Sequence, residues 1–228
     1  MDSLVSVVIP AHNSQRYIVA TFDSIIAQKH RPLEILVVDD GSTDSTRQIV
    51  REYGPEVRLI EQAQRGHPAA RNSGIRAAKG EFLAFLDHDD LWTPDKLEHQ
   101  IACFEHDPAL DLVFGQIQNF FTPEMTLEER GRFAIPLHPL PGLLQGAMLA
   151  RRRSFDRVGL FSEERGTGDF LDWYGRAMLA RMKVEMLPET VVYRRIHANN
   201  YQRTHRHERG EYLRAVKDLL DRRRGFLG

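Results

Sequence analysis

The stretch that decides the fold is Phe82-Leu83-Ala84-Phe85-Leu86-Asp87-His88-Asp89-Asp90. Its apolar part, residues 82–86, is typical of a buried strand. Three carboxylates follow at the carboxyl end of that strand, where open α/β sheets bind ligands. Gathered carboxylates repel one another unless a cation neutralises them, as a divalent metal carrying a phosphorylated ligand would. The alternative is a solvated acidic turn that caps the next helix.

The composition is that of an ordinary soluble domain. The chain has 228 residues, 42% of them hydrophobic and 28% charged, which suits one large α/β domain or two small ones. Its formal net charge of −1 gives no reason to expect nucleic-acid binding. The single cysteine, Cys103, excludes an intrachain disulfide and is expected to be buried filler on an apolar helical face.

The sequence opens directly on a strand pattern. We expect no signal peptide, because no basic segment followed by an apolar one precedes that strand. No apolar run approaches the ~20 residues that a membrane span needs. These features predict a cytoplasmic protein whose membrane contact, if any, is peripheral and at the inner face.

Strand and helix patterns alternate in the first half. Strands are predicted over residues 5–9, 35–38, 57–60, 82–86 and 112–114. Helices are predicted after caps at Asn13 or Ser14 and at Ser42 or Thr43, over residues 69–78, and from Thr93-Pro94 onward. This alternation predicts βαβ units and a largely parallel sheet. The acids that follow the second and fourth strands should then converge at one edge: Asp39, Asp40, Asp87 and Asp89.

The second half is less regular. Residues 119–142 contain four prolines and are predicted to form a substrate-facing loop or a partly mobile segment. Helices are predicted over residues 143–152, 169–181 and 206–224, and a strand over residues 191–193. The last helix is basic on one side. We expect it to pack on the domain, with contact to an anionic membrane as the alternative.

Four motifs carry a resemblance to a known family. They are Val5-Ser6-Val7-Val8-Ile9-Pro10-Ala11-His12-Asn13, Val37-Val38-Asp39-Asp40-Gly41-Ser42-Thr43-Asp44, Ala70-Arg71-Asn72-Ser73-Gly74-Ile75 and Asp87-His88-Asp89-Asp90. Each alone is weak, but their order and spacing over residues 4–100 are similar to the family 2 inverting glycosyltransferases of the GT-A fold. A looser match runs to about residue 200. The resemblance implies a Rossmann-like α/β/α sandwich with a mostly parallel central sheet.

The resemblance further implies a site for a nucleotide-sugar, with a UDP-sugar favoured. Asp39 is expected where a carboxylate can accept the N3–H of uracil or a ribose hydroxyl. The alternative for Asp39 is an anion placed at a helix N-terminus. Pro10, Ala11 and Asn13 are expected to line the base pocket, largely through their backbone.

Other residues of the matched motifs are also assigned to the donor. Arg71 and Asn72 are expected to approach the nucleotide, although Arg71 could instead pair with an acid such as Asp39. Asp87 is expected near the ribose, with His88 beside it in the same donor site.

The metal site is expected at Asp89. By resemblance this carboxylate binds Mn²⁺ or Mg²⁺, which bridges the diphosphate and stabilises the leaving nucleotide. His197, in a segment that resembles the closing H-x-x-N element of the family, is the second candidate ligand or a diphosphate contact, with a structural histidine as the alternative. Asp90 is expected to accept a hydrogen bond behind the metal or to cap the loop before Thr93.

The general base is expected within residues 166–173. The family usually has Glu-Asp at this place, whereas this chain has Gly168-Asp169. Asp169 is the favoured base, and Asp172, one helical turn later, is the alternative. Such a base deprotonates an acceptor hydroxyl as it attacks the anomeric carbon, and one displacement inverts the configuration.

These expectations describe one GT-A domain over residues 1–228. Residues 1–100 form the nucleotide-sugar half, residues 101–205 the acceptor and catalytic half, and residues 206–228 a C-terminal helix. The predicted activity is metal-dependent inverting transfer of a sugar to a hydroxyl acceptor, such as a lipid-linked or polysaccharide glycan of the cell envelope. The rivals are a catalytically inactive nucleotide-sugar binding module and a sugar-1-phosphate nucleotidyltransferase. The latter needs a glycine-rich loop after the first strand, and residues 10–14 contain no glycine.

Overall fold

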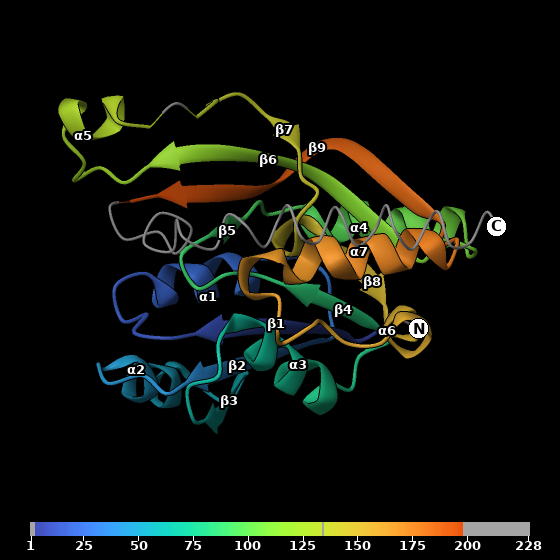
Figure 1. Cartoon of the computed structure of the whole chain (residues 1–228), viewed down its shortest axis with the longest axis horizontal. Helices are drawn as coiled ribbons and strands as arrows, with labels where there is room; N and C mark the ends of the chain where they lie inside the picture. Colours follow the sequence, from blue (N-terminus) through green and yellow to red (C-terminus); the bar gives the residue numbers. More distant parts are fainter. Residues whose placement is uncertain (1–2, 134, 198–228) are drawn as a thin grey trace.

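The computed structural model describes residues 3–133 and 135–197. A nine-stranded sheet runs through this part of the chain in the order β3-β2-β1-β4-β8-β6-β9-β5, with β7 paired to β6 outside that path (Figure 1). The strands are β1 (Val5–Ala11), β2 (Leu33–Asp40), β3 (Val57–Gln62), β4 (Phe82–Phe85), β5 (Leu91–Trp92), β6 (Leu112–Phe121), β7 (Leu140–Pro141), β8 (Leu149–Arg151) and β9 (Val184–Ile196). The helices are α1 (Ile18–Ile26), α2 (Thr46–Tyr53), α3 (His67–Ala77), α4 (Lys96–His106), α5 (Leu127–Gly131), α6 (Arg152–Val158) and α7 (Asp169–Leu179), with 3-10 turns η1 (Gln145–Ala147) and η2 (Gly166–Gly168).

The sheet is mostly parallel, as expected. β3, β2, β1 and β4 are parallel neighbours, and β6 is parallel to β9, whereas β5, β7 and β8 pair antiparallel. The chain moves outward from β1 through β2 to β3, and α3 then returns it to β4 on the other side of β1. The strand order therefore reverses between β1 and β4. Open α/β sheets bind ligands outside the carboxyl ends of the strands at such a point.

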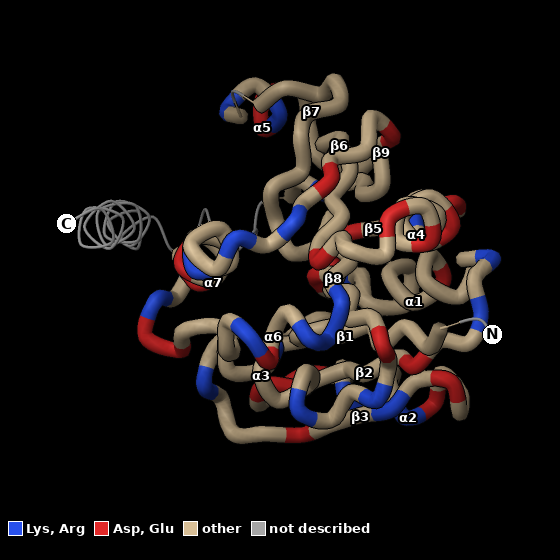
Figure 2. The backbone as a smooth tube through the Cα atoms, turned by 90° about the vertical axis from the view of Figure 1, so that its right-hand side faces the viewer, with Lys and Arg blue, Asp and Glu red and all other residues tan. Residues whose placement is uncertain are grey.

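Two apolar cores lie on the two faces of the sheet. Val7 and Ile9 of β1 belong to the core that contains the buried faces of α1, α2 and α4. Val8, between them, belongs to the core that contains α6 and α7. This alternation follows from the two-residue period of a strand. It gives three layers, and Figure 2 shows α7 on one side of the sheet and α1 and α4 on the other.

The predicted helix caps of the first half are wrong in detail, although the helices exist. Tyr17, not Asn13 or Ser14, is the N-cap residue of α1. The Ser14 hydroxyl instead accepts a hydrogen bond from the backbone N–H of His12 at 3.0 Å, so it is used in the turn after β1. The predicted N-caps of α2 and α4 are also wrong, because each helix begins later than the pattern indicated. Ser45 precedes α2 and Asp95 precedes α4, where the sequence pattern indicated Ser42 or Thr43 and then Thr93.

The helix predicted over residues 143–152 is wrong. Its middle is the 3-10 turn η1 and its end is β8 (Leu149–Arg151), which lies between β4 and β6 and pairs antiparallel with both. Leu, Ala and Arg favour helices, but pairing on two sides overrides the propensity of three residues. The strands around it are also longer than predicted, because β6 continues to Phe121 and β9 begins at Val184.

Residues 119–142 contain more regular structure than the predicted loop. The end of β6, the short helix α5 and β7 together form an arm that projects from the sheet (Figure 1). The predicted helix over 206–228, its proposed membrane contact and the end of the H-x-x-N element lie outside the described residues. Among the helices that are described, none has both the length and the apolar character needed to cross a bilayer.

Candidate functional site

The turns after β1 and β2 form one rim of the candidate site. Asn13, whose φ is 49°, donates its backbone N–H to the Ser42 hydroxyl at 2.9 Å. Its side-chain oxygen accepts the backbone N–H of Thr43 at 2.8 Å. Asn13 thus ties the two turns together, while Pro10 and Ala11 lie buried at the end of β1.

Asp39 has a carboxylate oxygen without a partner. The residue is 1% exposed and lies opposite Ala11 in the β1–β2 register. Its Oδ2 accepts the backbone N–H of Ser42 at 3.1 Å and lies 3.6 Å from Nε of Arg47. Its Oδ1 is buried and has no hydrogen-bond partner within residues 3–133 and 135–197. A buried acceptor left unpaired costs free energy, which a ligand donor would remove.

Asp40 has a different task, although it is the next residue. Its two carboxylate oxygens accept the backbone N–H groups of Arg65 at 2.8 Å and Gly66 at 2.7 Å, and the Gln62 amide at 2.7 Å. These bonds fix the loop that leads into α3. Asp40 therefore shapes the site through the backbone.

Arg71 joins the two halves of the chain. Its Nη2 donates to Oδ1 of Asp87, and its Nη1 donates to Oδ2 of Asp169, each at 2.9 Å. Arg71 is 5% exposed and Asp169 is 2% exposed. Burial raises the pKa of Asp169 above its ordinary value, and the Arg71 charge opposes that rise. The acids that pair with Arg71 are therefore Asp87 and Asp169, not Asp39.

Asn72, which the motif assigns to the nucleotide, has protein partners in this structure. Its side-chain amide donates to the Phe161 carbonyl at 2.9 Å and to Glu163 at 3.1 Å. Its side-chain oxygen accepts the Phe161 backbone N–H at 3.0 Å. With these bonds made and 1% exposure, Asn72 fastens the segment around Phe161 to α3, and its contact with a nucleotide stays a prediction.

Asp89 and His197 lie together, although 108 positions separate them. Nε2 of His197 is 3.0 Å from Oδ2 of Asp89. Burial disfavours ionisation of Asp89, but the His197 bond and the neighbouring histidine charges outweigh it and lower the pKa of Asp89 to about 2. Arg195 supports this corner, because its Nε donates to the Asp89 carbonyl and its backbone N–H donates to the carboxylate of Asp90.

This pair suits a divalent cation only in part. Among the residues that the structure describes, no group of three or more His, Cys, Asp or Glu is arranged to hold a metal. Asp89 and His197 offer two ligand atoms. Mg²⁺ is commonly held by one or two carboxylates together with substrate phosphates and water. The donor set therefore fits a metal that arrives with a diphosphate.

Two histidine rings border the same corner. The rings of His67, at the start of α3, and His88 lie edge to face with centroids 6.4 Å apart. Burial, and then the Arg71 charge, lower the pKa of His67 to about 4, so its imidazole is neutral at pH 7. Nδ1 of His88 is buried with no hydrogen-bond partner in the described part of the chain. His67 belongs to none of the sequence motifs, so only the structure reveals its position.

The two candidate bases differ in their surroundings. Asp169 contacts Arg71 and through it Asp87. Asp172 instead accepts a hydrogen bond from Arg176 at 2.9 Å, and the same guanidinium donates to the carbonyl of Leu160 at 2.7 Å. Asp172 thus helps to pack α7 against the segment after α6.

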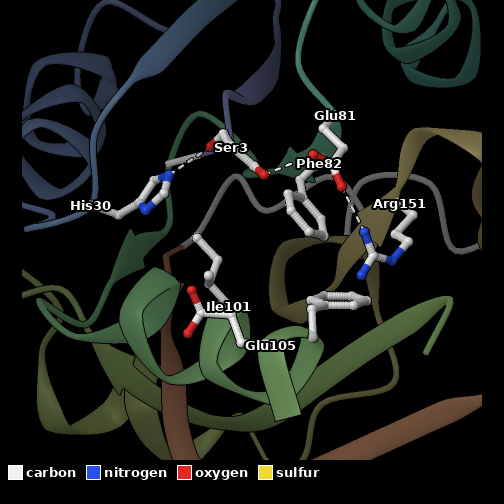
Figure 3. Close-up of a pocket in the computed structure, with 8 residues that line it drawn as sticks. Ser3, His30, Glu81, Phe82, Ile101, Glu105 and Arg151 are labelled. Atoms are coloured by element: carbon white, nitrogen blue, oxygen red, sulfur yellow. Dashed lines mark hydrogen bonds and ion pairs between the residues drawn. The ribbon is translucent and has the colours of Figure 1, made fainter. Parts of the chain in front are cut away.

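A small hollow lies at the other end of the sheet. It is lined by Ser3, His30, Glu81, Phe82, Ile101, Phe104, Glu105 and Arg151 (Figure 3). Glu81 accepts hydrogen bonds from Ser3 at 2.7 Å and from Arg151 at 2.6 Å. Because β4 begins at Phe82, the hollow is remote from the carboxyl ends of β1 and β4 and separate from the candidate site.

Comparison with known proteins identifies the family of this chain. Residues 6–159 match the sequence profile of "Glycosyl transferase family 2". An Escherichia coli protein named UDP-Glc:alpha-D-GlcNAc-diphosphoundecaprenol beta-1,3-glucosyltransferase is 40% identical over 103 residues, which are 44% of this chain and 41% of that protein. The chain spans 31% to 58% of the length of three Rickettsia relatives that it matches over 75% of its own length.

Solved structures share the fold. Staphylococcus aureus TarS in complex with UDP-GlcNAc has a TM-score of 0.70 and 22% identity, over 88% of this chain and 60% of that one. A Pyrobaculum calidifontis mannosyltransferase in complex with GDP-Man and Mn²⁺ has a TM-score of 0.70 and 23% identity, over 93% and 62%. The sheet is thus that of the GT-A glycosyltransferases. With a family profile matched over most of its length, the chain belongs to glycosyltransferase family 2.

Proposed function

We propose that this chain transfers a sugar from a nucleotide-sugar, with a UDP-sugar as donor, to a hydroxyl acceptor with inversion of the anomeric configuration. The observation that carries the proposal is the bridge from Asp87 through Arg71 to Asp169. It brings a carboxylate of the donor motif and a buried candidate base together at the strand-order reversal of the sheet. A binding module would have no need of a second, buried carboxylate there.

The donor lies along the carboxyl edge of β1, β2 and β4. The unpaired Oδ1 of Asp39 supports recognition of a base N–H, as uracil provides at N3. Pro10, Ala11 and Asn13 form the rim beside it. Half-exposed Asp87 and neighbouring His88 are within reach of the ribose and the diphosphate. The Escherichia coli relative is named for UDP-Glc, which is why we favour UDP over GDP.

Asp89 and His197 would hold Mn²⁺ or Mg²⁺ through a carboxylate oxygen and an imidazole nitrogen. When bound, the ion supplies positive charge against the diphosphate of the leaving nucleotide. The Mn²⁺ in the mannosyltransferase complex supports this choice of metals.

Asp169 serves as the general base. Arg71 keeps its carboxylate paired with a positive charge, which favours the ionised form that accepts a proton. The acceptor hydroxyl gives its proton to Asp169 while its oxygen bonds to the anomeric carbon. The bond from that carbon to the diphosphate oxygen breaks, and the nucleotide leaves with the electron pair. Attack opposite the leaving group inverts the configuration in one step.

We assign the donor to residues 3–100 and the acceptor to the described residues between 101 and 197. A lipid-linked glycan is the acceptor class that we favour, because the Escherichia coli relative is named for a diphosphoundecaprenol-linked sugar. The family assignment leaves the sugar-1-phosphate nucleotidyltransferase alternative without support.

A two-stage experiment tests the proposal. Thermal-shift measurements with UDP-glucose, UDP-GlcNAc, GDP-mannose and dTDP-glucose, with and without Mn²⁺, identify the donor, since a ligand that binds only the native state raises Tm. Release of the nucleotide is then followed, first with water and then with a panel of glycan acceptors. We expect a Mn²⁺-dependent shift with a UDP-sugar, followed by UDP release and a β-linked product from the α-linked donor. Binding without release in any condition would favour the inactive module, and retained configuration would exclude the single displacement.

A further inference from the structure

The candidate base has a second hydrogen-bond donor besides Arg71. Nη1 of Arg71 donates to Oδ2 of Asp169 at 2.9 Å, and Nε2 of Gln145 donates to Oδ1 at 3.3 Å. Each carboxylate oxygen therefore accepts one side-chain hydrogen bond. Two donors on different oxygens fix the rotation of the carboxylate plane, which a single donor does not.

Gln145 comes from a rigid part of the chain. It begins the turn η1 (Gln145–Ala147), which follows the arm of residues 119–142. Nε1 of Trp92 donates to the carbonyl of Gly146 at 3.3 Å. The side-chain amide of Gln100 donates to the carbonyl of Ala147 at 2.8 Å. The backbone next to Gln145 is thus held from β5 and α4.

A fully buried lysine completes this support. Lys96 is 0% exposed, and its ammonium donates to Oε1 of Gln100 and lies 4.9 Å from the centroid of the Trp92 ring. Because Lys96 occupies the oxygen of Gln100, the amide nitrogen of Gln100 is directed at the η1 carbonyl. Burying a lysine without a carboxylate is costly, and no carboxylate pairs with Lys96 among the residues that the structure describes. The bonds from Lys96 to Gln100 and from Gln100 to Ala147 hold η1 in place.

We propose that Gln145 is a positioning residue for the general base. It holds Asp169 in one orientation, from η1, so that Oδ1 is presented to the acceptor hydroxyl. Gln145 does not exchange a proton itself. The inference rests on the proposed role of Asp169 and adds the acceptor-side residue that orients it.

The test compares Gln145→Leu and Gln145→Glu with Gln48→Leu. Gln48 is a matched control, because it also donates to a carboxylate, that of Glu52 at 2.9 Å, but on the exposed face of α2. The readouts are Tm, UDP affinity with Mn²⁺ by calorimetry, and the pH profile of UDP release from UDP-glucose with water as acceptor. UDP-GlcNAc or GDP-mannose replaces UDP-glucose if it gives the larger thermal shift.

We expect Gln145→Leu to lower turnover about tenfold at pH 7.5, because the base is no longer aligned. The acidic limb of the profile should move up by about one pH unit, since a donor to the ionised carboxylate is lost. Gln145→Glu should move the limb further, through like charge, and UDP affinity should stay within about twofold. Gln48→Leu should match the wild type in every readout.

The inference would be overturned if Gln145→Leu had the turnover and the acidic limb of the wild type. It would also be overturned if the turnover fell while the acidic limb of the pH profile stayed in place. Asp169→Asn distinguishes a failure of the role of Gln145 from a failure of the proposed function. If Asp169→Asn is inactive and Gln145→Leu is normal, only the role of Gln145 fails. If Asp169→Asn keeps its activity, or the wild type releases no nucleotide with water or with any of the glycan acceptors, the proposed function fails and this inference fails with it.

Discussion

Arg71 and Asp169 form a buried ion pair at 2.9 Å between α3 and the first residue of α7, 98 positions apart in the sequence. The same guanidinium holds Asp87 at 2.9 Å. One cation thus connects the carboxylate that follows β4 with the carboxylate that begins α7. Buried charges of this kind are tolerated only when they are paired, so each member fixes the place of the others.

Asp169→Asn should abolish most of the transfer without weakening donor binding. The asparagine keeps the size of the side chain but cannot accept a proton, and general-base catalysis is worth about 10²-fold or more. Turnover and UDP affinity are measured on the same samples. Asp172→Asn is the control and should lose stability rather than turnover, because it breaks the bond to Arg176. An inactive Asp172→Asn beside an active Asp169→Asn would move the base one turn along α7.

The rate should depend on pH through the raised pKa of Asp169. The base works as the anion, and burial favours its neutral form, so activity should be lost on acidification at a higher pH than an ordinary aspartate with a pKa of about 3.9 would give. The rate therefore rises as pH increases through that pKa. A profile of kcat/KM from pH 4 to 8 measures it. An acidic limb at or below the ordinary value would contradict a buried base.

Asp39→Ala should weaken UDP binding by roughly 1–3 kcal/mol, the usual cost of losing a buried hydrogen bond. The variant should also distinguish less well between UDP and other nucleotides, because the unpaired Oδ1 is the group proposed to read the base. Calorimetry with UDP and GDP measures both effects. Equal UDP affinity in variant and wild type would remove Asp39 from the base pocket.

Asn72→Ala should affect stability and leave nucleotide affinity unchanged. The substitution leaves the backbone N–H and carbonyl of Phe161 without their partners. Each unpaired group lowers the free energy of unfolding by about 1–3 kcal/mol. Chemical denaturation measures the loss of stability, and titration of the folded variant with UDP measures its nucleotide affinity. A normal stability together with weaker UDP binding would restore the nucleotide role that the motif suggested.

The first half of the chain was predictable because its patterns are local. The strands before Pro10, before Asp40 and before Asp87 are apolar runs bounded by turn residues, and they lie where the pattern indicated. β8 was not predictable, because its three residues favour a helix in isolation and form a strand only between β4 and β6. A local sequence pattern could not predict the pairing of β6 with β9 either, because the two strands are far apart in the sequence.

The site was predictable to the extent that its residues belong to motifs. Asp89 and His197 lie 3.0 Å apart, and their shared role at a metal stays a prediction. Asn72 belongs to a motif too, but its neighbour in space, Phe161, has no sequence signal that pairs the two. No sequence signal pointed to Gln145 or His67. Each is a single polar residue outside any motif, and its contact is with a residue far along the chain.

Binding of the nucleotide through a metal at Asp89 is tested by UDP affinity with and without Mn²⁺, measured in the wild type and in Asp89→Asn. The matched control is Asp156→Asn, which changes an exposed carboxylate on α6. We predict that Mn²⁺ tightens UDP binding by about tenfold or more in the wild type and the control, since metal–phosphate contacts are worth several kcal/mol. In Asp89→Asn the two affinities should be equal. The same Mn²⁺ dependence in Asp89→Asn as in the wild type would contradict the account.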